Sequence, residues 1–246
     1  MRTRRTLACA LLLGCGLVLL SMLAAPYPAQ AQGNGLSPEL CYAVADGYID
    51  EQGMEVNGKD TLAYLNRQTG DTQPINGLIP NINTNFIEAI TFLPGGQQLY
   101  AADDYRLGAL ALDSATFTAI GDFGTAQGQL DADPELESLD LNDIDGLSIS
   151  PITGEMWGAH HTSPLNVGDP SPPDILVRIN RNTGAFIPGA FADPVNPGQQ
   201  VDFVVIQPIE GLNDIGDLAI DPLDGTIYAI MSEGGTHTRL VTINPA

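Results

Sequence analysis

Short apolar stretches separated by turn residues recur along the chain from about residue 38 onward. Three segments share one pattern and begin at Ile87, Ile144 and Ile215; they read IEAITFLPGGQQLYAA, IDGLSISPITGEMWGA and IGDLAIDPLDGTIYAI. In each of them a Pro follows the opening Ile by seven residues, and an aromatic residue follows that Pro by six. An apolar strand, a turn rich in Pro and Gly and a returning strand predict a β-hairpin. The aromatic residues are Tyr100, Trp157 and Tyr228, with Tyr42 as the counterpart in the first repeat.

A third strand is predicted after each hairpin. The segments are TLAYLNRQTG ending at Gly70, GALALDSAT ending at Thr116, ILVRINRNTG ending at Gly184 and RLVTINPA ending at Ala246. Their alternating apolar positions suit half-buried strands, and Asn-Arg-x-Thr-Gly is a turn in which Asn bonds the backbone and Gly takes a positive φ. A fourth strand is predicted in FTAIGDFG from Phe117 and in AFIPGAF from Ala185.

Four antiparallel strands repeated about every fifty to seventy residues are typical of β-propeller blades, because one blade must stack on its neighbours to bury both faces. We therefore predict an all-β protein, with blades over approximately 38–80, 85–124, 142–192 and 201–246. The first blade lacks its inner strand and the last lacks its outer strand. Two explanations remain open, a small ring that closes imperfectly or a piece of a longer chain. A solenoid or a β-sandwich is the alternative fold.

The order of motifs resembles known propeller families. A strand, a Pro-x-x-Gly turn, a Leu-Tyr-Ala strand and an Asn/Asp-x-x-Thr-Gly strand end are similar to those of the bacterial secreted propellers related to the NHL and YWTD groups. The chain also resembles the esterase-like phytase and lactonase propellers, whose inner strands often open with acidic residues. The resemblance covers roughly residues 38–246 and implies the architecture. It does not imply an activity, because no family catalytic motif can be carried over residue by residue.

The N-terminal residues have the pattern of an export signal. Three Arg precede an apolar run from Leu7 to Ala25, and Ala29-Gln30-Ala31 is a small-x-small cleavage site. We expect residues 1–31 to be a signal peptide and the mature domain to be secreted or held at the cell surface, in the periplasm or outside the cell. An uncleaved membrane anchor, a lipoprotein box at Leu12-Leu13-Gly14-Cys15 and twin-arginine export at Arg4-Arg5 are the alternatives.

Composition narrows the classes of partner. Apolar residues make up 43% of the chain and charged residues 16%, so a sizeable core is available. Lys and Arg number 9 against 30 Asp and Glu, for a net charge of −21, which excludes general affinity for nucleic acids or anionic membranes. Adaptation to a salty medium explains this charge equally well. Cys9 and Cys15 lie in the signal, so Cys41 has no cysteine to pair with and is interpreted as a buried apolar residue.

Acidic residues open the predicted inner strands, where a propeller has its central channel. Aligned repeats place Glu88, Asp145 and Gly216 in one register, Phe86, Asp143 and Asp214 in a second, Ala89, Gly146 and Asp217 in a third, and Asn85, Asn142 and Asn213 in a fourth. Carboxylate and amide oxygens that converge from several blades are what calcium requires. We therefore predict calcium as a candidate cofactor. The predicted ligands are Glu88, Asp145, Asp217, Asn142 and Asn213.

Other interpretations of the polar residues remain open. Asp and Asn at strand ends also cap the backbone. The acidic run from Asp131 to Glu137 is interpreted as a solvated loop, and Asp143-x-Asp145-Gly146 is not an EF-hand because Leu141 and Ile152 occupy its first and twelfth positions. His160 and His161 point to opposite faces of a strand, so they do not share a metal, but either one is a candidate acid or base beside Asp145.

Two classes of function follow from these observations. The first is a non-enzymatic, exported propeller that binds a protein, glycan or small-molecule ligand, with calcium as a structural ion. The alternative is a calcium-dependent hydrolase of the phytase or lactonase type. The scarcity of basic side chains argues against a phosphate-ester substrate, since Lys59 is the only lysine. Motifs of serine hydrolases, zinc metalloproteases and nucleotide-binding loops do not occur in the sequence.

Overall fold

The computed structural model describes residues 40–49, 55–66, 68–73, 75, 81–96, 98–130, 136–163, 172–209, 212, 214–233 and 237–245. All of these belong to one compact unit of residues 37–246. The predicted signal peptide, residues 1–31, lies outside the described residues. Within the described residues no helix is long and apolar enough to cross a membrane.

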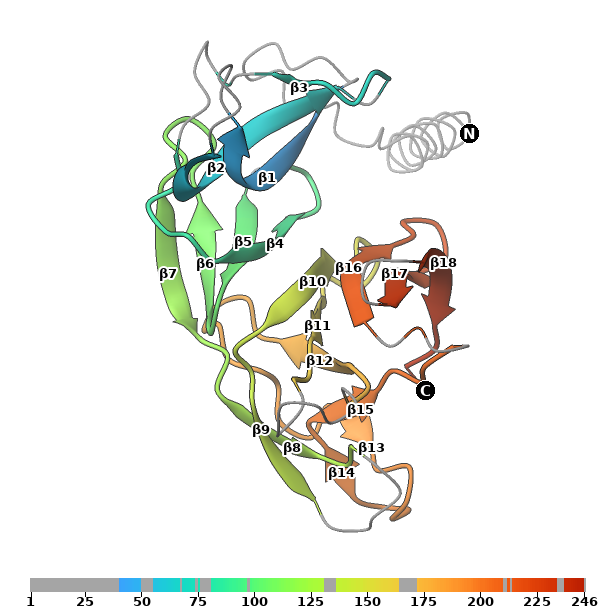
Figure 1. The fold of residues 1–246 in the computed structure, drawn as a ribbon. Helices are drawn as coiled ribbons and strands as arrows, with labels where there is room; N and C mark the ends of the chain where they lie inside the picture. The colour runs from blue at the N-terminus through green and yellow to red at the C-terminus, as the bar shows by residue number, and fades with distance from the viewer. Residues whose placement is uncertain are drawn as a thin grey trace, which may run out of the picture. The chain divides into compact units, whose positions relative to one another are not determined.

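Four antiparallel sheets follow one another along the chain, and we number them as blades one to four (Figure 1). The strands of blade one are, in sheet order, β1 (Leu40–Ile49), β2 (Glu55–Asn66) and β3 (Thr72–Gln73). The strands of blade two are β4 (Ile87–Phe92), β5 (Leu99–Asp103), β6 (Arg106–Leu110) and β7 (Phe117–Asp122).

Blades three and four repeat the same order. Blade three consists of β10 (Ile144–Ile149), β11 (Met156–His160), β12 (Ile175–Ile179) and β15 (Phe203–Val205). Blade four consists of β16 (Asp214–Ile220), β17 (Ile227–Glu233) and β18 (His237–Ile243). Two short ladders lie outside the blades, β8 (Thr125–Gly128) with β9 (Glu137–Asp140) and β13 (Phe191–Ala192) with β14 (Gln200–Val201). The all-β class and the four-stranded antiparallel blades predicted from the sequence are confirmed.

The outer strand of blade three differs from the expected one. The segment from Ala185 contributes only an isolated bridge between Ile179 and Phe186, and β15 instead pairs with β12. Pro188 and Gly189, the latter with φ of 60°, interrupt the expected strand after this bridge. The chain then forms the β13–β14 hairpin before it returns, so residues 203–205 belong to blade three although the repeat pattern predicted them in the fourth blade.

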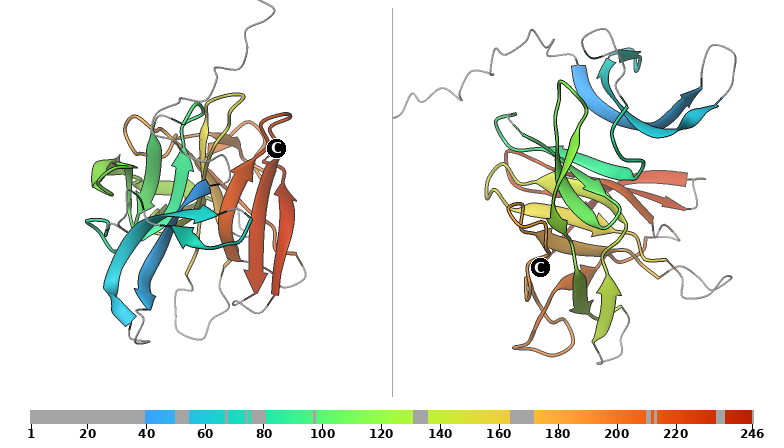
Figure 2. Two further views of the ribbon diagram at one scale, coloured as in Figure 1. Left: turned by 90° about the horizontal axis from the view of Figure 1, so that it is seen from above. Right: turned by 90° about the vertical axis from the view of Figure 1, so that its left-hand side faces the viewer.

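The first strands of blades two, three and four lie next to one another as inner strands, with β10 between β4 and β16 (Figures 1 and 2). Each inner strand contains one β-bulge at the same point of the repeat. The bulged residues are Glu88, Asp145 and Gly216, which the aligned repeats place in one register. A bulge inserts an unpaired residue near the start of the strand, so it directs that side chain out of the regular alternation.

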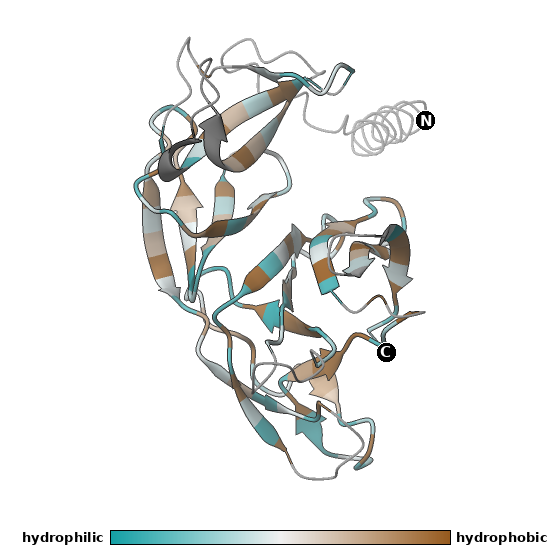
Figure 3. Ribbon diagram, viewed as in Figure 1, coloured by the Kyte–Doolittle hydropathy of each residue, from teal (hydrophilic) through white to brown (hydrophobic). Residues whose placement is uncertain are grey.

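Hydrophobic and hydrophilic residues alternate along the strands (Figure 3). Buried apolar side chains of adjacent blades form shared core clusters. We call the face that packs against the following blade the leading face, and the opposite one the trailing face. Ala159 and Leu176 on the leading face of blade three form one core cluster with Ile227 and Ala229 on the trailing face of blade four. Equivalent clusters join blade two to blade three and blade one to blade two.

Candidate functional site

A group of polar residues gathers where the inner strands begin. Asp145 at the bulge of β10, His161 directly after β11 and Asp214 at the start of β16 have potential ligand atoms that all lie within 4.8 Å of one another. We call these three residues the inner-strand cluster. All three are half-buried, and they come from blades three and four.

Backbone pairing fixes the position of His161. Its amide donates a hydrogen bond of 2.8 Å to the carbonyl oxygen of Asp143, just before β10. The same bond occurs in blade two, where the amide of Asp104 donates to the carbonyl oxygen of Phe86 at 2.9 Å. The repeat therefore places residue 161 beside the start of the inner strand, and the amino acid at that position decides the chemistry.

Asp174 lies behind the cluster and is almost completely buried. One carboxylate oxygen accepts the amide of Thr162 at 3.1 Å, and the other accepts the amide of Ile215, the first apolar residue of the next inner strand, at 2.6 Å. Asp60 occupies the equivalent position in blade one, and its carboxylate accepts the amide of Ile87 at 2.7 Å. These buried carboxylates tie the third strand of one blade to the inner strand of the next.

The imidazole of His161 lies between acidic side chains. Its Nδ1 is 3.2 Å from a carboxylate oxygen of Asp174 and 3.8 Å from one of Asp214. The close contact with Asp174 raises the pKa of His161 to about 9 against the opposing effect of burial, with the charges of Asp143 and Asp145 adding to the rise. Near neutral pH His161 is therefore a cation among carboxylates.

Asp145 is a second residue of the cluster whose pKa is shifted. Burial, together with the charges of Asp143 and Glu88 and against the opposing charge of His161, raises the pKa of Asp145 to about 7. A carboxyl group that exchanges its proton near neutral pH, beside a cationic imidazole, can bind a cation or transfer a proton.

His160 differs from its neighbour. It lies inside β11, opposite Ile144 and Ile175 in the sheet, and is almost completely buried. Burial lowers the pKa of His160, which favours the neutral imidazole. The two adjacent histidines thus have pKa values shifted in opposite directions.

The predicted calcium ligands lie at different places. Asp145 belongs to the inner-strand cluster, and Glu88 is exposed on the bulge of β4, where its charge acts on Asp145. Asn142 is exposed in the loop before β10. Asp217 is exposed and pairs across the sheet with Ile230, on the leading face of blade four, and its carboxylate accepts the amide of Leu218 at 2.7 Å. Asn213 lies outside the described residues.

Sequence reasoning did not select two residues that the structure brings to the site. Asp214 aligns with Asp143 in the repeats. The ligand prediction used the neighbouring register, with Glu88 and Asp145, and therefore left Asp214 out. Asp174 follows a long insertion, and nothing in its local sequence distinguishes it from a turn acid. Only its alignment with Asp60, each of them six residues before the Asn that ends the third strand, indicates its role.

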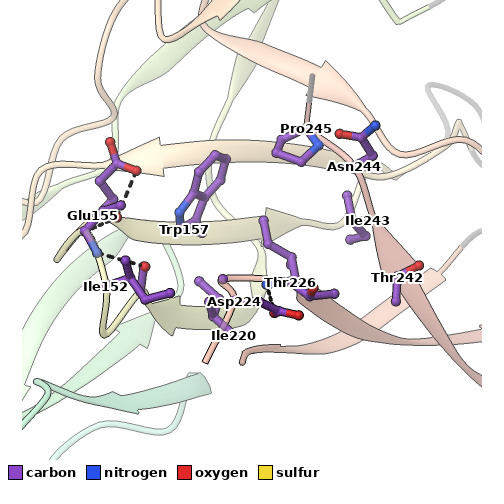
Figure 4. Close-up of a pocket in the computed structure, with 14 residues that line it drawn as sticks. Ile152, Glu155, Trp157, Ile220, Asp224, Thr226, Thr242, Ile243, Asn244 and Pro245 are labelled. Atoms are coloured by element: carbon purple, nitrogen blue, oxygen red, sulfur yellow. Dashed lines mark hydrogen bonds between the residues drawn. The ribbon is translucent and has the colours of Figure 1, made fainter. Parts of the chain in front are cut away.

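A groove lies at the opposite end of the inner strands, beside the hairpin turns of blades three and four (Figure 4). Its volume is about 520 Å³, and its lining combines apolar with polar side chains. Trp157 lies in it half-buried, with the Arg178 guanidinium 5.5 Å from the centre of its ring. The other lining residues include Ile152, Glu155, Ile220, Asp224, Thr226, Ile243 and Pro245.

No protein-family model and no curated protein matches the chain. Among solved structures, the luciferin-regenerating enzyme is similar with 13% identity and a TM-score of 0.38, over 77% of this chain and 54% of that one. The Dos1 propeller is similar with 10% identity and a TM-score of 0.35, over 76% of this chain and 39% of that one. A chain of the nidogen/laminin complex is similar with 11% identity and a TM-score of 0.37, over 81% of this chain and 76% of that one. The chain thus spans about half the length of the luciferin-regenerating enzyme. Its own stacked antiparallel blades, two with four and two with three described strands, identify it as an all-β protein of the β-propeller class.

Proposed function

We propose that the protein is a β-propeller binding module that holds a divalent cation in the inner-strand cluster. The observation that carries this proposal is the convergence of ligand atoms from Asp145, His161 and Asp214 within 4.8 Å. The charges of Asp143 and Glu88 add negative potential around Asp145. Calcium fits the carboxylate oxygens, whereas an imidazole ligand suits manganese or zinc better.

Protons compete with this cation. The pKa of His161 is raised to about 9, so its ring must lose a proton before it can act as a ligand. The protonated imidazole occupies the place of a cation between the carboxylates when no metal is bound. Cation binding should therefore release protons and become tighter as the pH rises from 6 to 8.

The test is thermal unfolding in calcium, magnesium, manganese or zinc at equal ionic strength, compared with EDTA. A specific site gives a rise in Tm of several degrees with one of these ions. The variants Asp145→Asn and Asp214→Asn should each abolish that rise in Tm. The control is Asp113→Asn, which changes an exposed acidic residue in a turn and should keep the rise. If no ion raises the Tm, or if the rise persists in both cluster variants, the proposal fails.

A hydrolase of the phytase or lactonase type is the second candidate function, and the state of Asp145 favours it. A carboxyl group with a pKa of about 7 beside a cationic His161 has the properties of a general acid or base. Hydrolysis of a panel of lactones, carboxylic esters and phosphate esters, with and without each cation, tests this candidate. Activity that Asp145→Asn removes and Asp113→Asn retains would support the enzyme, and inactivity across the panel would leave the binding module.

The proposal also includes export of the protein and a ligand other than nucleic acid. The Arg-rich start, the apolar run and Ala29-Gln30-Ala31 support a cleaved signal, with Gln32 as the first mature residue. N-terminal sequencing of the secreted product tests the cleavage site. The net charge of −21 favours a protein, glycan or small-molecule ligand over nucleic acid.

A further inference from the structure

The groove beside the hairpin turns departs from the repeat. At the junction of blades two and three, Tyr100 and Ile149 lie in one core cluster and are only 9% and 5% exposed. Their counterparts at the junction of blades three and four are Trp157 and Ile220. These two side chains are half-buried and line the groove (Figure 4). The same pair of positions is therefore closed at one junction and open at the next.

The residue beside Trp157 also differs between the two blades. Blade two pairs Tyr100 with Ala109 across the sheet, whereas blade three pairs Trp157 with Arg178. The Arg178 guanidinium lies over the indole, 5.5 Å from the ring centre. It also forms an ion pair with Glu155, another residue of the groove. Blade three thus holds an aromatic ring and an ion pair where blade two has only a tyrosine and an alanine.

Polar side chains of the turns complete the lining. The Thr153 hydroxyl donates a hydrogen bond of 3.1 Å to the carboxylate of Glu155. From blade four, the exposed Asp224 accepts the amide of Thr226 at 2.9 Å, which fixes its carboxylate in the β16–β17 turn, and Thr242 adds a hydroxyl. The volume of about 520 Å³ lies within the range of small-molecule sites. Hydrogen-bonding groups from two blades therefore surround an aromatic ring.

Three classes of ligand fit this lining poorly. A phosphate or another anion would meet the carboxylates of Glu155 and Asp224 in a chain with a net charge of −21. A cationic ligand that stacked on Trp157 would meet the guanidinium of Arg178, which already lies over the ring. A wholly apolar ligand would remove water from both carboxylates without replacing its hydrogen bonds. An uncharged ligand with an apolar face and several hydroxyl groups avoids all three costs.

We propose that this groove binds a neutral carbohydrate. A sugar ring has apolar C–H groups that pack on an aromatic ring, and hydroxyl groups that both donate and accept hydrogen bonds. Trp157 supplies the aromatic surface, and the carboxylates of Glu155 and Asp224 accept hydrogen bonds from the sugar hydroxyls. Arg178 holds the indole and Glu155 in position. The site goes beyond the proposed cation site, since the inner-strand cluster lies at the other end of the inner strands.

Trp157 is the only tryptophan of the chain, so its fluorescence reports directly on the groove. The probes are uncharged disaccharides of glucose, galactose, mannose, xylose or N-acetylglucosamine, titrated into the full chain. At least one of them should change the emission with saturation, at a dissociation constant on the order of 1 mM. The affinity should be the same in about 20 and about 200 mM NaCl, because the ligand has no charge to screen. It should also persist in EDTA, which separates this site from the inner-strand cluster.

Calorimetry of variants tests both sides of the groove. Asp224→Ala should weaken binding at least about fivefold, since it removes a hydrogen-bond acceptor for the sugar from an exposed position. The control Asp113→Ala removes an exposed turn acid of blade two and should leave the affinity unchanged. Trp157→Ala should abolish binding. Circular dichroism and melting curves close to those of the wild type show that each variant is folded.

Choline and inorganic phosphate serve as charged comparison probes. A saturable change with either of them, and with none of the disaccharides, would overturn the proposal. A titration in which no probe changes the emission would overturn it equally. The same holds for a disaccharide affinity that Asp224→Ala and Trp157→Ala both leave at the wild-type value.

Discussion

His161 and the acids around it show how one side chain acquires properties that its local sequence does not contain. Asp174 meets His161 across the antiparallel pairing of β11 with β12 in the same blade, and Asp214 meets it because blade four stacks on blade three. Asp143 and Asp145 add charge from the inner strand. The imidazolium then offsets part of the repulsion among carboxylates that stacking has forced together.

The charge on His161 should make stability depend on pH. The pKa of His161 is raised from 6.5 to about 9 in the folded state, so its contribution is fully present below about pH 6.5 and is lost as the pH rises through 9. We expect the unfolding free energy of metal-free protein to fall by on the order of 2 kcal/mol between pH 6.5 and 9.5. Urea unfolding measures this slope, and His161→Gln should flatten it. An equal slope in that variant would contradict the assignment.

Asp174 should matter through its two backbone hydrogen bonds. In Asp174→Ala the amides of Thr162 and Ile215 lose a charged acceptor in a buried place. We expect a loss of about 3 kcal/mol in unfolding free energy. Asp224→Ala, which removes an exposed carboxylate that accepts the amide of Thr226, should cost far less. Denaturant unfolding of both variants measures the two losses in unfolding free energy. Equal losses would contradict a strong contribution of Asp174 to the link between blades three and four.

At the scale of elements, one repeat serves two purposes. The alternation of each strand supplies a leading and a trailing face, and the bulge near the start of each inner strand frees one side chain from that alternation. Glu88, Asp145 and Gly216 occupy this bulge in the three blades. Packing thus constrains the regular positions, while the bulged position is available for polar residues.

Equivalent leucines in different blades should respond differently to truncation. Leu176→Ala removes a fully buried side chain between blades three and four, so we expect a loss of about 3 kcal/mol. Leu240→Ala removes a side chain that is 71% exposed, and in dilute protein it should cost less than about 0.5 kcal/mol. Urea unfolding at low protein concentration compares them. Equal losses would mean that blade four is covered within a single chain.

The whole molecule carries a net charge of −21, with 30 acidic residues against 9 basic ones. Repulsion among these carboxylates opposes the compact state, and the Debye length of about 10 Å at 0.1 M salt sets the range over which it acts. The acidic surface and the inner-strand cluster therefore respond to ions in different ways, one through general screening and the other through a specific site.

Monovalent salt should stabilise the protein without a binding site. Raising NaCl from about 20 to about 200 mM should increase the Tm by about 3–6 °C, because it screens the self-repulsion. The increase should persist in Asp145→Asn, which leaves most of the surface charge in place. Differential scanning calorimetry measures it, and a Tm that is independent of NaCl would show that the acidic residues are already well separated.

The sequence by itself determined the repeat, the hairpins and the register of the inner strands. These depend on local properties, namely the two-residue period of strands and the turn preferences of Pro, Gly and Asn, so the repeats alone were enough to align Glu88, Asp145 and Gly216. The four strands of blade two followed from the same local signals.

Only the tertiary structure decided which of these residues meet. Asp214 of blade four reaches His161 and Asp174 of blade three because the two blades stack, and distances between blades depend on packing that no local pattern encodes. The same stacking buries Leu176 and leaves Leu240 exposed although their sequence positions are equivalent. The tertiary structure also decided the outer strand of blade three. Pro188 and Gly189 interrupt the segment from Ala185, so residues 203–205 pair with β12 instead.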